Sequence, residues 1–182
     1  MNWLTYHKLT KNKPPHPSLL KALGYVKNKD KALDIGSGGF RDAKYLLSKF
    51  KKVTAIDATI NSKIPLGLNF KKTKFETFNF LVEEYDLINA QFSLPFLKKK
   101  DFLEVWGEVQ KSLKANGIFV GQFFGNKDGW VGKNYSFFDK KQVEKLVHNF
   151  TILNFEEVYE KRKLASNIQK QWHYFEVILK KI

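Results

Sequence analysis

Short apolar segments alternate with amphipathic ones along nearly the whole chain, and this alternation constrains the fold more than any other feature. The apolar segments have the length of strands, and the segments between them carry apolar residues at helical spacing. Such alternation is typical of a parallel sheet with helices on both faces. Strands are expected at 31–35, 53–57, 69–75, 85–91, 117–124, 152–158 and 172–179, and helices at 18–25, 40–50, 61–66, 101–113 and 140–150.

The last two expected strands are joined by a polar segment that is too short to include a covering helix. Strands joined in this way pair antiparallel, so we expect an antiparallel hairpin at one edge of the sheet. The apolar run 117–124 (GIFVGQFF) is typical of a strand covered on both faces. The sequence therefore predicts an α/β fold with a doubly wound, seven-stranded, mostly parallel sheet and an antiparallel edge hairpin.

The length of 182 residues fits one domain, expected to span 1–182. Within it, we expect a helical N-terminal lid segment at 1–30 and a core at 31–182. The proline-rich stretch 11–17 is expected to be a connector, because proline removes helical hydrogen bonds. Asp139 is expected to cap the helix that follows it.

The composition excludes several classes of site. Without cysteine, the chain can form no disulfide framework, thiolate metal site or cysteine nucleophile. The four histidines have no metal-ligand spacing, so no metal is expected. The N-terminus has no signal-peptide pattern, and no apolar run approaches the length of a membrane span. A cytoplasmic protein without membrane contact is therefore expected.

The formal net charge of +14 raises the question of a polyanionic partner. Only Arg41 and Arg162 are arginines, whereas specific nucleic-acid sites favour the bidentate arginine side chain. The lysines are scattered in small clusters. This pattern favours an origin of the charge in a genome whose proteins are generally rich in lysine. Nucleic acid is therefore a possible partner but not the favoured one, and the sequence does not indicate an oligomeric state.

Two features lie where such sheets bind ligands, beyond the carboxyl ends of the strands. Gly36 and Gly38 follow the first expected strand, and they allow a sharp turn and close approach of a ligand. Asp57 ends the second strand, 21 residues after Gly36, and an acid there can accept hydrogen bonds from both ribose hydroxyls of an adenosine. Asp57 can equally cap the next turn.

Two residues distinguish among the adenosine cofactors. The dinucleotide pattern G-x-G-x-x-G requires a third glycine where this chain has Arg41. Asp34, just before the glycine loop, would repel a pyrophosphate, but its carboxylate suits a cationic amino-acid headgroup.

The segment Asp34-Ile35-Gly36-Ser37-Gly38-Gly39 resembles the first motif of Rossmann-type (class I) S-adenosylmethionine-dependent methyltransferases, with Asp57 at the position of their ribose-binding acid. The segment 85–90 (YDLINA) is similar to their fourth strand, and the resemblance covers nearly the whole chain. Within this superfamily, 93–96 (SLPF) and 123–130 (FFGNKDGW) resemble the small bacterial tellurite-resistance-like branch.

The resemblance implies S-adenosyl-L-methionine as the cofactor and methyl transfer as the reaction. It places Asp34 near the amino group, Asp57 on the ribose and Ala58 on the adenine. The implied cofactor-binding residues are Asp34, Gly36, Ser37, Gly38, Asp57, Ala58, Phe75, Glu76, Asn89, Ala90 and Gln91. Many relatives have an acid near position 74 for the adenine amino group, whereas this chain has Lys74.

The segment 89–92 (NAQF) resembles the N-P-P-Y/F motif of amino-group methylators, but both prolines are missing, which disfavours methylation of a base nitrogen. On the acceptor side, the candidates are Tyr6, Phe92, Trp130 and Glu157, with His173 as a possible general base. His173 can equally have a structural role, and Tyr6 and Trp130 can equally be packing residues of a lid.

The sequence therefore favours S-adenosylmethionine-dependent methyl transfer to a small-molecule acceptor. Methylation of RNA or protein, a catalytically idle cofactor-binding protein and a nicotinamide oxidoreductase remain alternatives.

Overall fold

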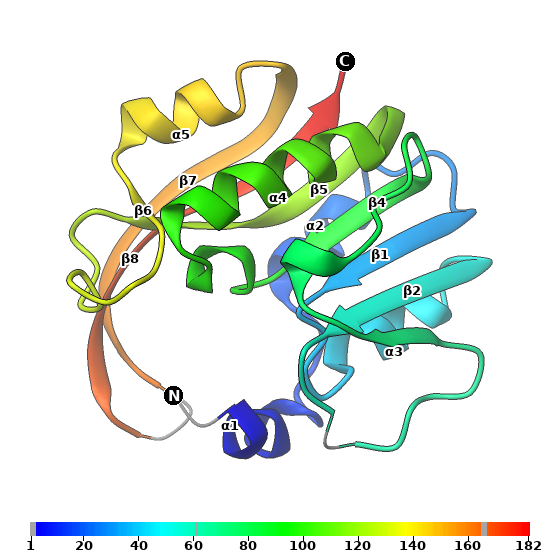
Figure 1. Cartoon of the computed structure of the whole chain (residues 1–182), viewed down its shortest axis with the longest axis horizontal. Helices are drawn as coiled ribbons and strands as arrows, with labels where there is room; N and C mark the ends of the chain where they lie inside the picture. The colour runs from blue at the N-terminus through cyan, green and yellow to red at the C-terminus, as the bar shows by residue number, and fades with distance from the viewer. Residues whose placement is uncertain (1–2, 61, 165–166) are drawn as a thin grey trace.

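The computed structural model describes residues 3–60, 62–164 and 167–182. Its strands form one sheet in the order β3-β2-β1-β4-β5-β8-β7, with the short β6 paired to β5 (Figure 1). The strands are β1 (Lys31–Ile35), β2 (Lys52–Asp57), β3 (Asn69–Lys72), β4 (Tyr85–Ala90), β5 (Leu113–Gly125), β6 (Phe137–Phe138), β7 (Phe150–Lys163) and β8 (Gln169–Lys181). The helices are α1 (Trp3–Thr10), α2 (Pro17–Leu23), α3 (Arg41–Leu47), α4 (Lys99–Ser112) and α5 (Lys140–Leu146), with the 3-10 turns η1 (Phe75–Thr77) and η2 (Leu94–Phe96).

Strand β8 runs antiparallel to both of its neighbours, β5 and β7, whereas the other strand pairs are parallel. This arrangement confirms the predicted α/β fold with an antiparallel pair at one edge. The described sheet has eight strands rather than the predicted seven, because the two-residue β6 adds to the main path. A strand of two residues is too short to give a periodic signal in a sequence.

Helices cover both faces of the sheet (Figure 1). On one face, α4 buries Phe102, Val105, Trp106 and Val109, and α5 buries Val143. On the other face, α2 and α3 pack on the sheet through side chains that include Leu19 and Leu46. The sheet therefore lies between two apolar cores. Its central strand β4 is buried along its whole length.

The hairpin of β7 and β8 is longer than predicted. Its strands pair from Phe150 and Lys181 to Lys163 and Gln169, beyond the apolar segments at 152–158 and 172–179. Strands pair through their backbones and need no apolar side chains for this. The outer half of the hairpin is polar, so its sequence has no apolar pattern that would predict a strand. Figure 1 shows this outer half reaching past the sheet toward α1, which lies within the predicted lid segment 1–30.

Three local predictions need correction. No helix forms over 62–66, and Asn61 lies outside the described residues; Pro65 limits helical hydrogen bonding there. The helix expected at 40–50 begins at Arg41, because Phe40 has left-handed backbone geometry with φ of 64°. The strand expected at 69–75 ends at Lys72. The capping role of Asp139 is confirmed, since its side chain accepts a hydrogen bond from the Gln142 backbone.

Within the ranges that the structure describes, no helix has both the length and the apolar character that a membrane span requires.

Candidate active site

A cavity of about 620 Å³ lies beyond the carboxyl ends of β1, β2 and β4. Residues of α1, of the segment after β5 and of the outer half of the β7–β8 hairpin form its other walls. Its lining residues are Trp3, Tyr6, His7, Thr10, Lys13, His16, Pro17, Asp34, Gly36, Ser37, Gly38, Gly39, Arg41, Asp42, Asp57, Ala58, Thr59, Lys74, Phe75, Glu76, Gln91, Phe92, Ser93, Phe96, Leu97, Trp130, Arg162, Lys163, Leu164 and Trp172.

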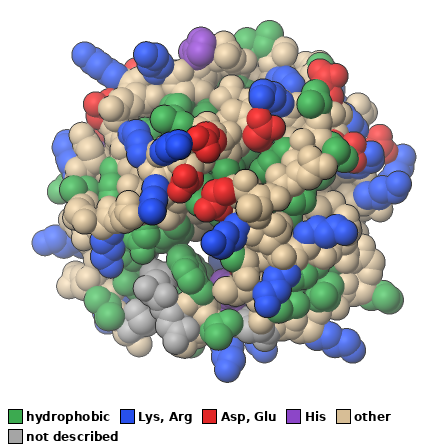
Figure 2. All heavy atoms as spheres, in the orientation of Figure 1, with side chains coloured by type: hydrophobic (Ala, Val, Ile, Leu, Met, Phe, Trp, Pro, Cys, Tyr) green, Lys and Arg blue, Asp and Glu red, His purple; other side chains and the backbone are tan. Residues whose placement is uncertain are grey.

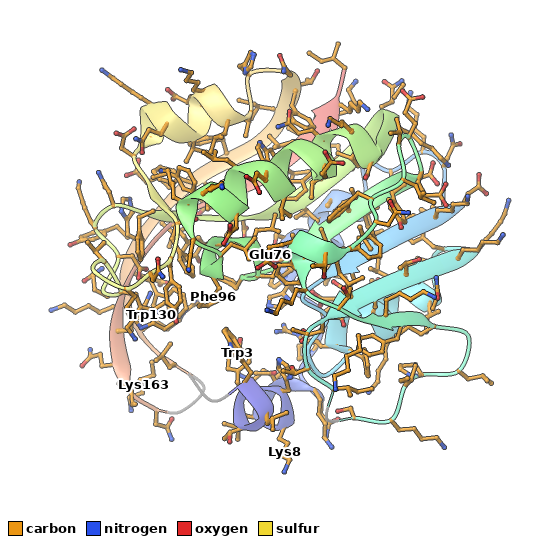
Figure 3. All side chains as sticks on the ribbon, viewed as in Figure 1. Trp3, Lys8, Glu76, Phe96, Trp130 and Lys163 are labelled. Atoms are coloured by element: carbon orange, nitrogen blue, oxygen red, sulfur yellow. The ribbon has the colours of Figure 1, made fainter. Side chains whose placement is uncertain are left out.

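Figure 3 shows how side chains from distant segments face this opening. Trp3 points from α1 into it, whereas Lys8 on the same helix points away. Phe96 and Trp130 lie on the hairpin side of the opening, and Glu76 lies opposite them. The cavity therefore has two ends, one at the glycine loop after β1 and one against the antiparallel strands.

The glycine loop needs glycine for both conformation and space. Gly36 and Gly38 have left-handed φ values of 77° and 51°. A Cβ atom on Gly38 would lie 2.9 Å from the His7 ring, and one on Gly36 would overlap Ser93. The loop therefore lies between α1 and the turn that follows β4, and its backbone forms part of the cavity wall.

Asp57 supports this loop from the end of β2. Its Oδ2 accepts a hydrogen bond from the Gly38 backbone at 2.9 Å. Its Oδ1 accepts bonds from the backbone and the hydroxyl of Thr59, at 2.8 and 2.9 Å. The capping role is therefore present, and Asp57 also lines the cavity, where its remaining lone pairs can accept further bonds.

Asp34 is a buried carboxyl group at the glycine-loop end. Burial, together with the neighbouring charge of Asp42, raises its pKa to about 8. Its Oδ1 accepts a bond from the Asn89 amide at 2.7 Å, whereas its Oδ2 has no partner in the protein. Because Asp34 lines the cavity, a cationic ligand group could satisfy that oxygen.

A second acid beside Asp34 was not predicted from the sequence. Asp42 in α3 accepts hydrogen bonds from the backbone and the ring Nδ1 of His16, at 3.0 and 2.7 Å. Burial opposes ionisation of Asp42, but these bonds hold its pKa below the usual range. Arg41 contacts Nε2 of the same ring at 3.1 Å. This network ties the proline-rich connector to the glycine-loop helix.

Of the three residues expected around the sulfonium, only Gln91 lines the cavity. Asn89 and Ala90 are buried behind it. Asn89 donates to Asp34 and Asp42 and accepts a bond from the Gln91 amide, so it contacts the cavity only through these neighbours. Gln122 in β5 continues the chain of bonds to Gln91 and to the Phe92 backbone.

The expected acceptor-side residues are divided between two places. Tyr6, Phe92 and Trp130 line the cavity, whereas Glu157 and His173 are not among its lining residues. His173 is 2% exposed, and its Nδ1 accepts a bond from the Lys127 backbone at 2.9 Å. Its Nε2 lies 3.1 Å from a Glu157 oxygen. Both ring nitrogens are thus engaged away from the cavity, an arrangement typical of a structural histidine.

Helix α1 contributes more to the cavity than Tyr6 alone. Trp3, Tyr6, His7 and Thr10 all line it. Their spacing places them on one face of a helix, and that spacing is the signal that could have identified them in the sequence. Ser93, Phe96 and Trp172, which also line the cavity, have no comparable local signal.

Unpartnered polar atoms gather around this cavity. Among the described residues, six buried side-chain polar atoms have no hydrogen-bond partner, and five of these side chains belong to cavity-lining residues: His7, Asp34, Ser37, Ser93 and Trp172. Buried polar groups are nearly always bonded in folded proteins. Their concentration here indicates a binding site for a polar ligand. No group of three or more potential metal-ligating side chains occurs in the described parts of the chain.

Comparisons with known proteins agree with this geometry. Residues 33–121 match the family described as "Methyltransferase domain". A comparison with curated protein sequences gives no match.

Three solved structures illustrate the likeness of fold. The 1,6-didemethyltoxoflavin-N1-methyltransferase of Burkholderia thailandensis, solved with 1,6-didemethyltoxoflavin and S-adenosylhomocysteine, is 17% identical with a TM-score of 0.71, covering 97% of this chain and 84% of that one. TehB of Haemophilus influenzae is 14% identical with a TM-score of 0.77, covering 97% and 66%. The N-methyltransferase NodS of Bradyrhizobium japonicum, solved with S-adenosylhomocysteine, is 16% identical with a TM-score of 0.66, covering 97% and 98%.

Proposed function

We propose that this chain, which is a Rossmann-type S-adenosylmethionine-dependent methyltransferase, transfers the methyl group to a small-molecule acceptor bound in the cavity. The observation that carries the proposal is the two-ended cavity itself. One end has the glycine loop and buried acids, and the other has an aromatic wall, within one volume of about 620 Å³. That volume is in the range of small-molecule sites.

The glycine-loop end fits the cofactor. The unpartnered Oδ2 of Asp34 suits its cationic amino group, and Asp57 has free acceptor capacity for the ribose hydroxyls. The backbone of Gly36 and Gly38, in left-handed geometry, forms part of the cavity wall at this end.

The adenine side of the proposed site has both apolar and charged neighbours. Ala58, Phe75 and Glu76 line the cavity there, and Lys74 lies beside them in place of an acid. Ser37, with an unpartnered hydroxyl, and Gln91 complete the proposed contacts. Asn89 and Ala90 act as supports of this surface rather than as contacts.

When bound, S-adenosylmethionine supplies an electrophilic methyl group on a sulfonium. The protein's part is to hold the acceptor in line with that methyl group, because such displacements are accelerated mainly by position. Gln91 and Phe92 lie between the two ends of the cavity, where the acceptor would meet the methyl group.

A small acceptor is favoured because the far end of the cavity is narrowed by neighbouring segments. Helix α1 and the outer part of the hairpin lie over it, and Trp3 contacts Phe96 across the opening at 4.7 Å between ring centroids. The charge of +14 favours the alternative of methylating RNA. However, Figure 2 shows lysine and arginine side chains spread around the whole visible face rather than gathered in one patch.

The test is a labelling experiment with S-adenosylmethionine that carries a radioactive methyl group. The purified protein is incubated separately with the low-molecular-mass fraction, the RNA and the protein of a bacterial extract. We expect label in the low-molecular-mass fraction, and less with Asp34→Asn. Label confined to acid-precipitable RNA or protein would refute the small-molecule proposal and support the alternative.

A further inference from the structure

The acceptor end of the cavity is walled by aromatic rings that touch one another. Ring-centroid distances are 4.7 Å for Trp3–Phe96, 5.6 Å for Phe96–Trp130 and 5.4 Å for Trp130–Trp172. Phe92 joins the wall at 5.5 Å from Trp172. These rings come from α1, from the turns after β4 and β5, and from β8. A continuous aromatic wall favours a flat, apolar partner.

Aromatic rings also bind cations, but two rings of this wall, Trp130 and Trp172, already have cationic side chains beside them. The Lys170 ammonium lies 3.6 Å from the Trp172 centroid and 4.0 Å from the Trp130 centroid. Asp128 holds it there through a buried ion pair at 2.5 Å. The Arg162 guanidinium lies 5.5 Å from the Trp172 centroid. A cationic amine at this wall would compete with these groups and be repelled by Arg162.

The mouth of this end is positive. Arg162 and Lys163, from the outer part of β7, line the cavity. The partner of Arg162, Glu160, is at 3.5 Å, and both side chains are substantially exposed, so much of the arginine's charge remains available. No carboxylate among the described lining residues comes from α1, β7 or β8.

Of the four acids that line the cavity among the described residues, three lie at the glycine-loop end and are hydrogen-bonded within the protein. Asp42 is bonded to His16, Asp57 to Gly38 and Thr59, and Asp34 to Asn89. The fourth, Glu76, lies on η1 beside the opening (Figure 3).

Among the described residues, the aromatic wall supplies no proton acceptor. His173 lies outside the cavity, and the two histidines that line it, His7 and His16, lie at the glycine-loop end, where His7 packs on Gly38 and His16 bonds to Asp42. Burial raises the pKa of the Tyr6 hydroxyl, so it stays protonated. An acceptor that needed deprotonation would find no base here, whereas an acceptor that is already ionised needs none.

From the aromatic wall, the cationic side chains beside Trp130 and Trp172, and the positive mouth, we propose that the acceptor is a planar aromatic anion. The inference rests on the proposed function, because it concerns the acceptor end of the same cavity. The ionised atom of the acceptor donates the electron pair of its new bond to the methyl carbon, the carbon–sulfur bond breaks, and its electron pair stays on sulfur. No proton has to be removed.

The experiment uses the full chain saturated with S-adenosylhomocysteine. Four probes of similar size are titrated: benzoate, benzamide, benzylammonium and cyclohexanecarboxylate. Binding is followed by calorimetry and by quenching of tryptophan fluorescence, since Trp3, Trp130 and Trp172 line the cavity. We expect benzoate to bind about tenfold more tightly than benzylammonium and several-fold more tightly than benzamide or cyclohexanecarboxylate.

A matched pair of variants tests the role of the positive mouth. Arg162→Gln should weaken benzoate binding by about five- to tenfold and leave benzamide binding unchanged. Lys161→Gln makes the same charge change at the preceding, exposed residue, which does not line the cavity, and should leave both unchanged. Equal loss of benzoate and benzamide binding in Arg162→Gln would show a merely structural effect and overturn the inference.

The remaining outcomes separate the inference from the proposed function. Benzylammonium binding as tight as benzoate, or no benzoate binding, overturns the anionic class even where label enters a small molecule. Label found only in RNA or protein overturns the proposed function itself.

Discussion

Asp34 on β1 and Asn89 on β4 are register partners, and the Asn89 amide donates a hydrogen bond to the Asp34 carboxyl group over 2.7 Å. This bond uses one oxygen of a buried acid and leaves the other facing no protein donor. The protein thus holds a carboxyl group whose ionisation is costly until a cation arrives. That arrangement links cofactor affinity, pH and the stability of the free protein.

Asp34→Asn should weaken binding of S-adenosylhomocysteine by about ten- to a hundredfold, because a charge-assisted bond to the amino group is lost. The melting temperature of the free protein at neutral pH should rise, since a neutral amide avoids the cost of protonating the acid on folding. Calorimetry and thermal melts measure the two effects. Asp86→Asn is the matched control: Asp86 is equally buried but pairs with Lys114 away from the cavity, so this variant should lose stability and keep its affinity.

Cofactor affinity should depend on pH through Asp34. Burial and the Asp42 charge raise its pKa from 3.8 to about 8 in the free protein, and a bound cationic amino group favours the ionised form. Binding below that pKa therefore releases a proton, and affinity should rise with pH by up to about tenfold per unit between about pH 6 and about pH 7.5. Titrations in buffers of different ionisation enthalpy would detect the proton. A slope equally steep in Asp34→Asn would assign the proton to another group.

The same shift has a consequence for the free protein. Between pH 3.8 and about 8, the folded state retains a proton on Asp34 that the unfolded state has lost. Asp34 therefore contributes stability that is lost as pH rises through this window. Comparing thermal melts of the parent protein and Asp34→Asn across the window isolates this contribution from those of the other groups.

Asp57→Ala should weaken S-adenosylhomocysteine binding by about ten- to a hundredfold through loss of the ribose contacts. It should also cost about 1–2 kcal/mol of stability, because Gly38 and Thr59 lose their acceptor. Thr59→Ala removes only the hydroxyl bond to Asp57 and should keep affinity within about threefold. Normal binding by a folded Asp57→Ala protein would leave Asp57 with the capping role alone.

His173→Asn should lower the melting temperature by several degrees and leave turnover per folded molecule within about fivefold of the parent. The reason is that His173 bonds to Lys127 and Glu157 behind the cavity wall rather than in the cavity. Chemical denaturation gives the folded fraction, and the labelling assay gives turnover. A hundredfold loss of turnover with an unchanged melting temperature would restore the general-base hypothesis.

Local patterns in the sequence were sufficient for the sheet, and they pointed to Asp34, Gly36, Gly38 and Asp57 at the glycine-loop end of the cavity, although not to Asp42. The alternation of segments predicts the parallel sheet and its antiparallel edge, because a helix or strand with buried faces has apolar residues at a characteristic spacing in the sequence. Gly36 and Gly38 are recognisable because their backbone geometry excludes side chains, and Asp34 because its charge opposes a pyrophosphate. Each of these inferences depends on neighbours within a few residues.

Contacts between distant segments around the cavity were decided by tertiary structure alone. Trp3 meets Phe96, and His16 meets Asp42, across separations in the chain that no local pattern encodes. Histidine is a common general base, which made His173 a catalytic candidate, yet in the folded hairpin its ring bonds to Lys127 and Glu157. Such contacts depend on how helices and strands pack in space, so the cavity-lining face of α1, the aromatic wall and the positive mouth form only once the chain has folded.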